Sequence, residues 1–226
     1  MSMTIHKFLI AGGNATALVQ GCPASRRTSL AANLLREVEQ VGFMDVHARP
    51  PFMEMMGGEL CINATLAFAS HVGPAGRILV SGSEHPISFE NTSETTRAAI
   101  PLQWSMTENL VLLEGIGFVL HPQSAGRVPA KNELAELCAT FGLPAFGAIF
   151  YSGEAITPYV YVAAMDSYVP ETACGSGSVA YSLFSGREQI RQPTGRIITV
   201  HQATIAESTD TGRNTFEIEA RVEPAC

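Results

Sequence analysis

Two segments of the sequence place a cysteine directly before a helix rich in small residues, and this repeat constrains the fold more than any other feature. The first is GGELCINATLAFA around Cys61, and the second is PETACGSGSVAYS around Cys174. In both segments the cysteine follows a predicted strand and a glutamate, and it stands where the helix is expected to begin. The repeat therefore predicts two similar domains, each offering one thiol.

The hydrophobic pattern along the chain predicts an α+β protein. Apolar residues recur at helical spacing in segments 29–42, 61–72, 132–142 and 178–186. Short apolar runs broken by turn residues predict mainly antiparallel strands within 8–21, 52–60, 77–82, 87–93, 100–106, 109–121, 145–153, 156–166, 195–207 and 215–223.

The domain boundary is expected where the composition changes. Segment 121–131, HPQSAGRVPAK, is rich in Pro, Gly and polar residues, which is typical of a linker. We expect an N-terminal domain over 1–121 that carries Cys61 and a C-terminal domain over 122–213 that carries Cys174. The last strand, within 214–226, is expected to return to the first domain.

Charge and composition exclude several classes of partner. The net charge is −7, and no run of Lys or Arg accompanies an aromatic cluster, so we expect neither nucleic acid nor membrane as a partner. No stretch of eighteen apolar residues and no signal-like start occurs, which predicts a cytoplasmic protein. The five cysteines form no CxxC pair, so we expect reduced thiols without a disulfide framework or a metal site.

Cys61 and Cys174 differ from the other cysteines in their predicted position. Cys22, Cys138 and Cys226 are interpreted as small buried hydrophobic residues. A helix N-terminus favours an anion, so it is expected to lower a thiol pKa from about 8.5 towards neutrality. Two such thiols that face one carbon could remove a proton from one side and return one on the other, which inverts a stereocentre without a cofactor. The free amides there could hold a substrate carboxylate.

The second segment allows three rival interpretations. GSGSVA at 175–180 matches the GxGxxA dinucleotide turn, but no acidic residue follows between 189 and 206. A cysteine hydrolase needs a histidine beside the thiol, and His71 and His201 stand in no recognisable motif. A pyridoxal phosphate racemase needs a Schiff-base lysine, and the two lysines lie outside any helix start or glycine-rich setting.

Several motifs also resemble a known family. IAGGNATALV, EQVGF at 39–43, MMGGELCINAT, ETACGSGS and QPTGRIITV are similar to motifs of the diaminopimelate-epimerase-like superfamily of cofactor-independent amino-acid racemases and epimerases. Within it, the sequence most resembles the histidine racemases that supply D-histidine for opine-type metallophores. The resemblance implies two pseudo-symmetric domains, each a curled β-sheet around a central helix, with the site in the cleft between them.

The resemblance also implies roles for single residues. Cys61 and Cys174 match the two catalytic thiols. The residues matching substrate-binding positions are Asn14, Glu39, Ile62, Asn63, Gly175 and Ser176. Ile62 stands where the family usually has glycine, so its amide is retained while its β-branched side chain is expected to narrow the pocket. SYVPETAC lacks the arginine that binds the distal carboxylate of diaminopimelate, which favours a substrate with an uncharged or cationic side chain, such as histidine.

Structural alternatives exist for these polar residues. Asn14 could be a turn residue with positive φ, Glu39 a solvated charge in the last turn of a helix, and Asn63 a first-turn polar residue. Glu59 and Glu171 are interpreted as capping residues. For the whole chain, the alternatives are an epimerase of another amino acid, of the diaminopimelate or hydroxyproline type, and a non-catalytic amino-acid-binding protein. A homodimer stays open.

Overall fold

The computed structural model describes residues 2–125, 128–202 and 211–225, with the backbone alone for 125 and 211–213. The predictions for Cys226 and for the strand residues 203–207 lie outside this part. The N-terminal half contains β1 (Thr4–Ile10), β2 (Gly13–Gln20), α1 (Ala24–Leu34), β3 (Gln40–Asp45), β4 (Phe52–Met55), α2 (Ile62–Val72), β5 (Ala75–Val80), β6 (Ile87–Asn91), β7 (Thr96–Thr107), β8 (Leu110–Leu113) and β9 (Ile116–Pro122).

The C-terminal half has two longer helices and two short 3-10 turns among its strands. Its elements are η1 (Gln123–Ala125), α3 (Lys131–Phe141), β10 (Ala145–Ser152), β11 (Ala155–Val162), η2 (Ala163–Met165), β12 (Ser167–Pro170), α4 (Gly175–Ser185), β13 (Gln189–Arg191), β14 (Ile197–Gln202), β15 (Thr211–Ala220) and β16 (Val222–Pro224). No helix in the described part of the chain is both long and apolar enough to cross a membrane.

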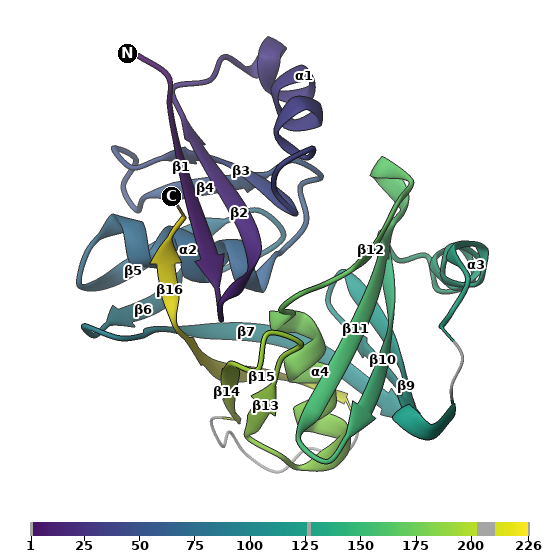
Figure 1. Ribbon diagram of the computed structural model, residues 1–226. Coiled ribbons are helices and arrows are strands. Elements are labelled where there is room, and N and C mark those ends of the chain that lie inside the picture. Colours follow the sequence, from purple (N-terminus) through teal and green to yellow (C-terminus); the bar gives the residue numbers. More distant parts are fainter. Residues whose placement is uncertain (1, 126–127, 203–210, 226) are drawn as a thin grey trace.

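The two halves are built alike, each around one central helix. Figure 1 shows α2 among strands of the N-terminal half and α4 among those of the C-terminal half, to which β8 and β9 add, whereas α1 and α3 lie on the outside. Leu66 and Phe68 of α2 are fully buried, as are Val179 and Ala180 of α4. A helix that is apolar on all sides must be surrounded by other elements, so these two helices form the interior of the protein. The predicted α+β class with curled sheets around central helices is confirmed.

Two long strands connect the halves. β15 pairs antiparallel with β7 from Thr211 to Ala220, and it also pairs with β14. β16 then pairs antiparallel with β1, so the end of the described chain lies beside its first strand (Figure 1). The predicted domain boundaries, 1–121 and 122–213, stay a prediction.

The strands are mainly antiparallel, as expected, although four pairings in the described sheet are parallel: β2–β3, β4–β5, β9–β10 and β11–β13. The predicted helix over 29–42 was wrong in its second half, because α1 ends at Leu34 and 40–45 form β3. Val41 and Phe43 are buried, and β3 pairs on both sides with β2 and β4. Sheet pairing of these β-branched and aromatic residues therefore outweighs the helical spacing.

Candidate active site

Both cysteines of the repeat are the N-cap residues of the central helices. Cys61 precedes α2 with an extended backbone, and its Sγ accepts a hydrogen bond from the Ala64 amide at 3.4 Å. Cys174 precedes α4 in the same conformation, and its Sγ accepts from the Gly177 amide at 3.2 Å. The first amides of a helix have no acceptor within it, so each thiol supplies one.

Each of the two central helices also has a hydroxyl side chain that donates a hydrogen bond to the carbonyl of its N-cap cysteine. Thr65 Oγ1 donates to the Cys61 carbonyl at 2.7 Å, and Ser178 Oγ donates to the Cys174 carbonyl at 2.7 Å. The repeat in the sequence is therefore also a repeat of local structure.

The two thiols line one cavity between the halves. Six of the eight predicted site residues are among its lining residues, and Asn14 and Glu39 are not. The lining residues are Gln40, Gly57, Glu59, Leu60, Cys61, Ile62, Asn63, Gly115, Ile116, Pro144, Ala145, Val160, Val162, Ala164, Glu171, Cys174, Gly175 and Ser176.

Burial raises the pKa of both thiols, which corrects the expectation of a lowered pKa. At Cys174, burial acts together with the charge and hydrogen bond of Glu171, and at Cys61 together with the charges of Glu59 and Glu171. The Cys61 thiol donates to Gln40 Oε1 at 2.8 Å. The helix amides at each sulfur lower the pKa, but loss of solvent around a thiolate outweighs them.

Glu59 and Glu171 do not cap the helices, because the cysteines occupy both N-cap positions. Both glutamates instead line the cavity. Burial raises the pKa of Glu171 to about 7, and burial likewise raises the pKa of Glu59. Glu171 Oε2 is buried and meets no N–H or O–H donor in the described part of the chain. The cavity thus presents carboxylates to any ligand.

Asn63 crosses from the N-terminal half to the segment around Cys174. Its Nδ2 donates to the Ala173 carbonyl at 3.0 Å, and its Oδ1 accepts from the Gly175 amide at 3.0 Å. The Gly175 amide, expected to receive a carboxylate, therefore has a protein acceptor. The Ile62 and Ser176 amides, which also belong to the first turns, have no acceptor within their own helices.

Ile62 packs directly against Gly175. A Cβ built on Gly175 would lie 2.5 Å from Ile62 Cγ2 and 2.8 Å from Ile62 Cβ. Ile62 is 2% exposed, so its side chain fills the space between the two helix starts. The Ile62 side chain, directly after Cys61, thus fits because Gly175, directly after Cys174, has no side chain.

Asn14 and Glu39 contact the second half through one threonine. Thr172 Oγ1 accepts from the Asn14 amide at 2.6 Å and donates to Glu39 Oε1 at 2.7 Å, while Asn14 Nδ2 donates to Glu39 Oε2 at 3.2 Å. Asn14 has the left-handed φ of 41° expected of a turn residue, but it lies at the start of β2 rather than in the turn itself. Glu39 is half-buried rather than solvated, and burial raises its pKa. Substrate contact by Asn14 and Glu39 stays a prediction.

Three polar residues near the thiols were not predicted from the sequence. Gln40 accepts from Cys61, Thr172 holds the turn before Cys174, and Gln192 Oε1 accepts from the Cys174 amide at 2.9 Å. Each belongs to a motif already quoted: EQVGF, ETACG and QPTGR. Residue type alone did not identify these three residues as part of the site, because glutamine and threonine are common in turns and strands throughout proteins.

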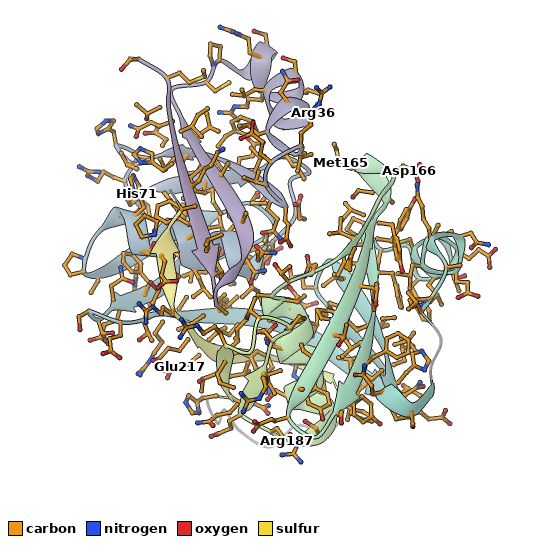
Figure 2. The ribbon with its side chains drawn as sticks, in the orientation of Figure 1. Arg36, His71, Met165, Asp166, Arg187 and Glu217 are labelled. Atoms are coloured by element: carbon orange, nitrogen blue, oxygen red, sulfur yellow. The ribbon has the colours of Figure 1, made fainter. Side chains whose placement is uncertain are left out.

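The residues required by the rival mechanisms lie elsewhere. The His71 ring packs against the His6 ring at a tilt of 45° with centroids 4.5 Å apart, on the side of the N-terminal half that faces away from the C-terminal half (Figure 2). His201 is paired with Glu188. Neither histidine, nor Lys7 or Lys131, is among the lining residues.

The comparisons with known proteins agree with this geometry. No family model matches the chain. A histidine racemase from Fusobacterium nucleatum is 23% identical over 224 residues, which cover 81% of this chain and 84% of the relative. A solved structure described as a predicted epimerase from Pseudomonas aeruginosa superposes with a TM-score of 0.72 at 11% identity, covering 100% of this chain and 98% of the other. A hydroxyproline epimerase from Agrobacterium vitis, with bound trans-4-hydroxy-L-proline, gives a TM-score of 0.60 at 13% identity, covering 99% and 91%.

The chain has the diaminopimelate-epimerase-like fold. The resemblance stated from the motifs is thereby confirmed at the level of the superfamily fold. The relatives and neighbours support an isomerase of the racemase and epimerase type.

Proposed function

We propose that the protein is a cofactor-independent amino-acid racemase that inverts the α-carbon of histidine, with Cys61 and Cys174 as its two catalytic bases. The observation that carries the proposal is the position of both thiols on one cavity, each at the N-terminus of an equivalent central helix. One thiolate removes the α-proton, and the opposite thiol donates its proton to the other face of the carbanion. With the opposite enantiomer the two cysteines exchange roles.

The cavity supplies the groups that hold an amino acid. The Ile62 and Ser176 amides are the candidates for the substrate carboxylate, since first-turn amides favour an anion. The carboxylates of Glu59 and Glu171 are the candidates for cationic groups. A bound ammonium would offset their negative charge, and this lowers the cost of forming a thiolate beside them.

The charge of the cavity supports the choice of histidine. None of its lining residues is Lys, Arg or His, whereas Glu59 and Glu171 are both present. An acidic side chain would therefore be repelled, and a neutral or cationic one accepted. Histidine is named because the curated relative is a histidine racemase. From the resemblance of its motifs to the histidine racemases of opine-type metallophore pathways, we propose that the D-histidine serves such a metallophore. We also propose that domains 1–121 and 122–213 close around the substrate.

The proposal is tested by chiral chromatography of L-amino acids incubated with the reduced protein. We expect D-histidine from the wild type and none from Cys61→Ser or Cys174→Ser. Cys138→Ser is the matched control, because Cys138 is buried against other elements and does not line the cavity. No inversion of any amino acid by the wild type, or near-normal inversion by either of the first two variants, would contradict the proposal.

A further inference from the structure

The segment that carries Cys174 is attached to the N-terminal half on both sides of the thiol. After the cysteine, the Gly175 amide donates to Asn63 Oδ1, and before it the Ala173 carbonyl accepts from Asn63 Nδ2. Thr172 adds two further bonds to that half. Cys174 therefore sits in the middle of a short chain segment whose neighbours are held by residues from the Cys61 half.

Thr172 uses its hydroxyl to join two separate elements of that half. A hydroxyl can donate once and accept twice. Here it accepts from the amide of Asn14, at the start of β2, and donates to the carboxylate of Glu39, just before β3. The other Glu39 oxygen is held by Asn14 Nδ2, so both carboxylate oxygens are engaged. Hydrogen bonds to a carboxylate are stronger than those between neutral groups.

Gly13, the first residue of β2, lies in close contact with Thr172. A Cβ on Gly13 would lie 2.5 Å from Thr172 Oγ1 and 2.8 Å from Thr194 Cγ2. Thr194 Oγ1 donates to the Ala11 carbonyl at 2.7 Å. Glycine at 13 lets the backbone approach the second half closely, and the Ala11 carbonyl and the Asn14 amide on either side of it both bond to that half.

We propose that Thr172 is a positioning residue that fastens the Cys174 segment to Asn14 and Glu39 and so sets the second thiol opposite the first. It touches no reacting atom, and neither Asn14 nor Glu39 lines the cavity. When Thr172 loses its hydroxyl, the segment opens more often, and Cys174 is displaced while Cys61 keeps its own helix contacts. The attachment stands on the geometry alone, and its effect on catalysis rests on the proposed function.

The attachment is tested by alkylation of the reduced protein with iodoacetamide, followed by peptide mass spectrometry. Cys174 is 3% exposed and Cys138 is 4% exposed, so each reacts only when its surroundings open. In Thr172→Val, which keeps the branched shape, we expect alkylation of Cys174 to accelerate about tenfold, because two hydrogen bonds are lost. Thr172→Ser keeps the hydroxyl and should react like the wild type, and Cys138 should be unchanged in both. An unchanged Cys174 rate, or an equal rise at Cys138, would overturn the proposal.

A second readout tests the catalytic consequence. In deuterium oxide, a displaced Cys174 leaves the carbanion unprotonated for longer, so the Cys61 S–H can exchange with solvent and return a deuteron to the face from which the proton was removed. We therefore expect Thr172→Val to lower inversion by about tenfold more than it lowers α-proton exchange. Equal losses of both rates would overturn the positioning role. If the wild type exchanges no amino acid, the proposed function fails, and the alkylation result still decides whether Thr172 fastens the segment.

Discussion

Replacing Glu171 with glutamine should stabilise the protein in a pH-dependent way. Burial raises the pKa of Glu171 to about 7, from an ordinary value of 4.5. Below about pH 4.5 the Glu171 carboxyl is protonated in both the folded and the unfolded protein, so it carries no cost of a buried charge. As the pH rises from about 4.5 through about 7, the unfolded state loses the proton first, and the free energy of unfolding falls because the folded state must finally hold a buried charge.

The size of the effect follows from the same two values. A difference between 4.5 and about 7 corresponds to about 3 kcal/mol at high pH. We expect about 2 to 3 kcal/mol, because the residue is half-buried while its Oε2 is fully buried. Glutamine is neutral throughout, so Glu171→Gln should gain this amount over the wild type above pH 7.5 and almost nothing near pH 4.

Urea denaturation of both proteins at pH 4.5, 6, 7 and 8.5 would measure the difference. Glu39 and Glu59, whose pKa values burial also raises, titrate in both proteins, and so their effects largely cancel. A difference in unfolding free energy that is the same at pH 4.5 and 8.5 would refute the reasoning. So would a variant that is less stable than the wild type at pH 8.5.

Substitutions at Gln192 and Gly175 test the packing around Cys174. Gln192→Leu removes the acceptor of the Cys174 amide and the donor to Ser178 Oγ, so urea denaturation should show a loss of about 1 to 3 kcal/mol. Gln192→Glu should lose at least as much above the carboxyl pKa, because it keeps the acceptor but turns a buried carboxylate oxygen towards the Ile190 carbonyl. Gly175→Ala places a Cβ 2.5 Å from Ile62 Cγ2, which should cost about 1 to 3 kcal/mol. In the double variant with Ile62→Gly, that cost should shrink by at least about 1 kcal/mol, and additive losses would contradict the contact.

The central features of the fold could be predicted because they repeat in the sequence. A cysteine before a small-residue helix appears twice, and the structure places both cysteines at helix N-caps. The helix predicted over 29–42 failed where the chain pairs with β2 and β4, since pairing depends on distant partners that a local pattern does not contain.

The electrostatics of the site could not be predicted from helix position alone. A helix start favours a thiolate, but the sequence does not show that Glu171 and Glu59 face the same cavity or how deeply the sulfurs are buried. The contacts of Thr172 with Asn14 and Glu39 join residues far apart in the chain, so only the folded arrangement reveals them.

The most direct test of the two-base mechanism is the early distribution of deuterium when L-histidine reacts with the wild type in deuterium oxide. Because the two thiols act on opposite faces, we expect the first D-histidine to carry deuterium at the α-carbon, while the recovered L-histidine carries almost none. Deuterium entering L-histidine as fast as D-histidine would point to a single base, and no exchange at all would contradict the racemase.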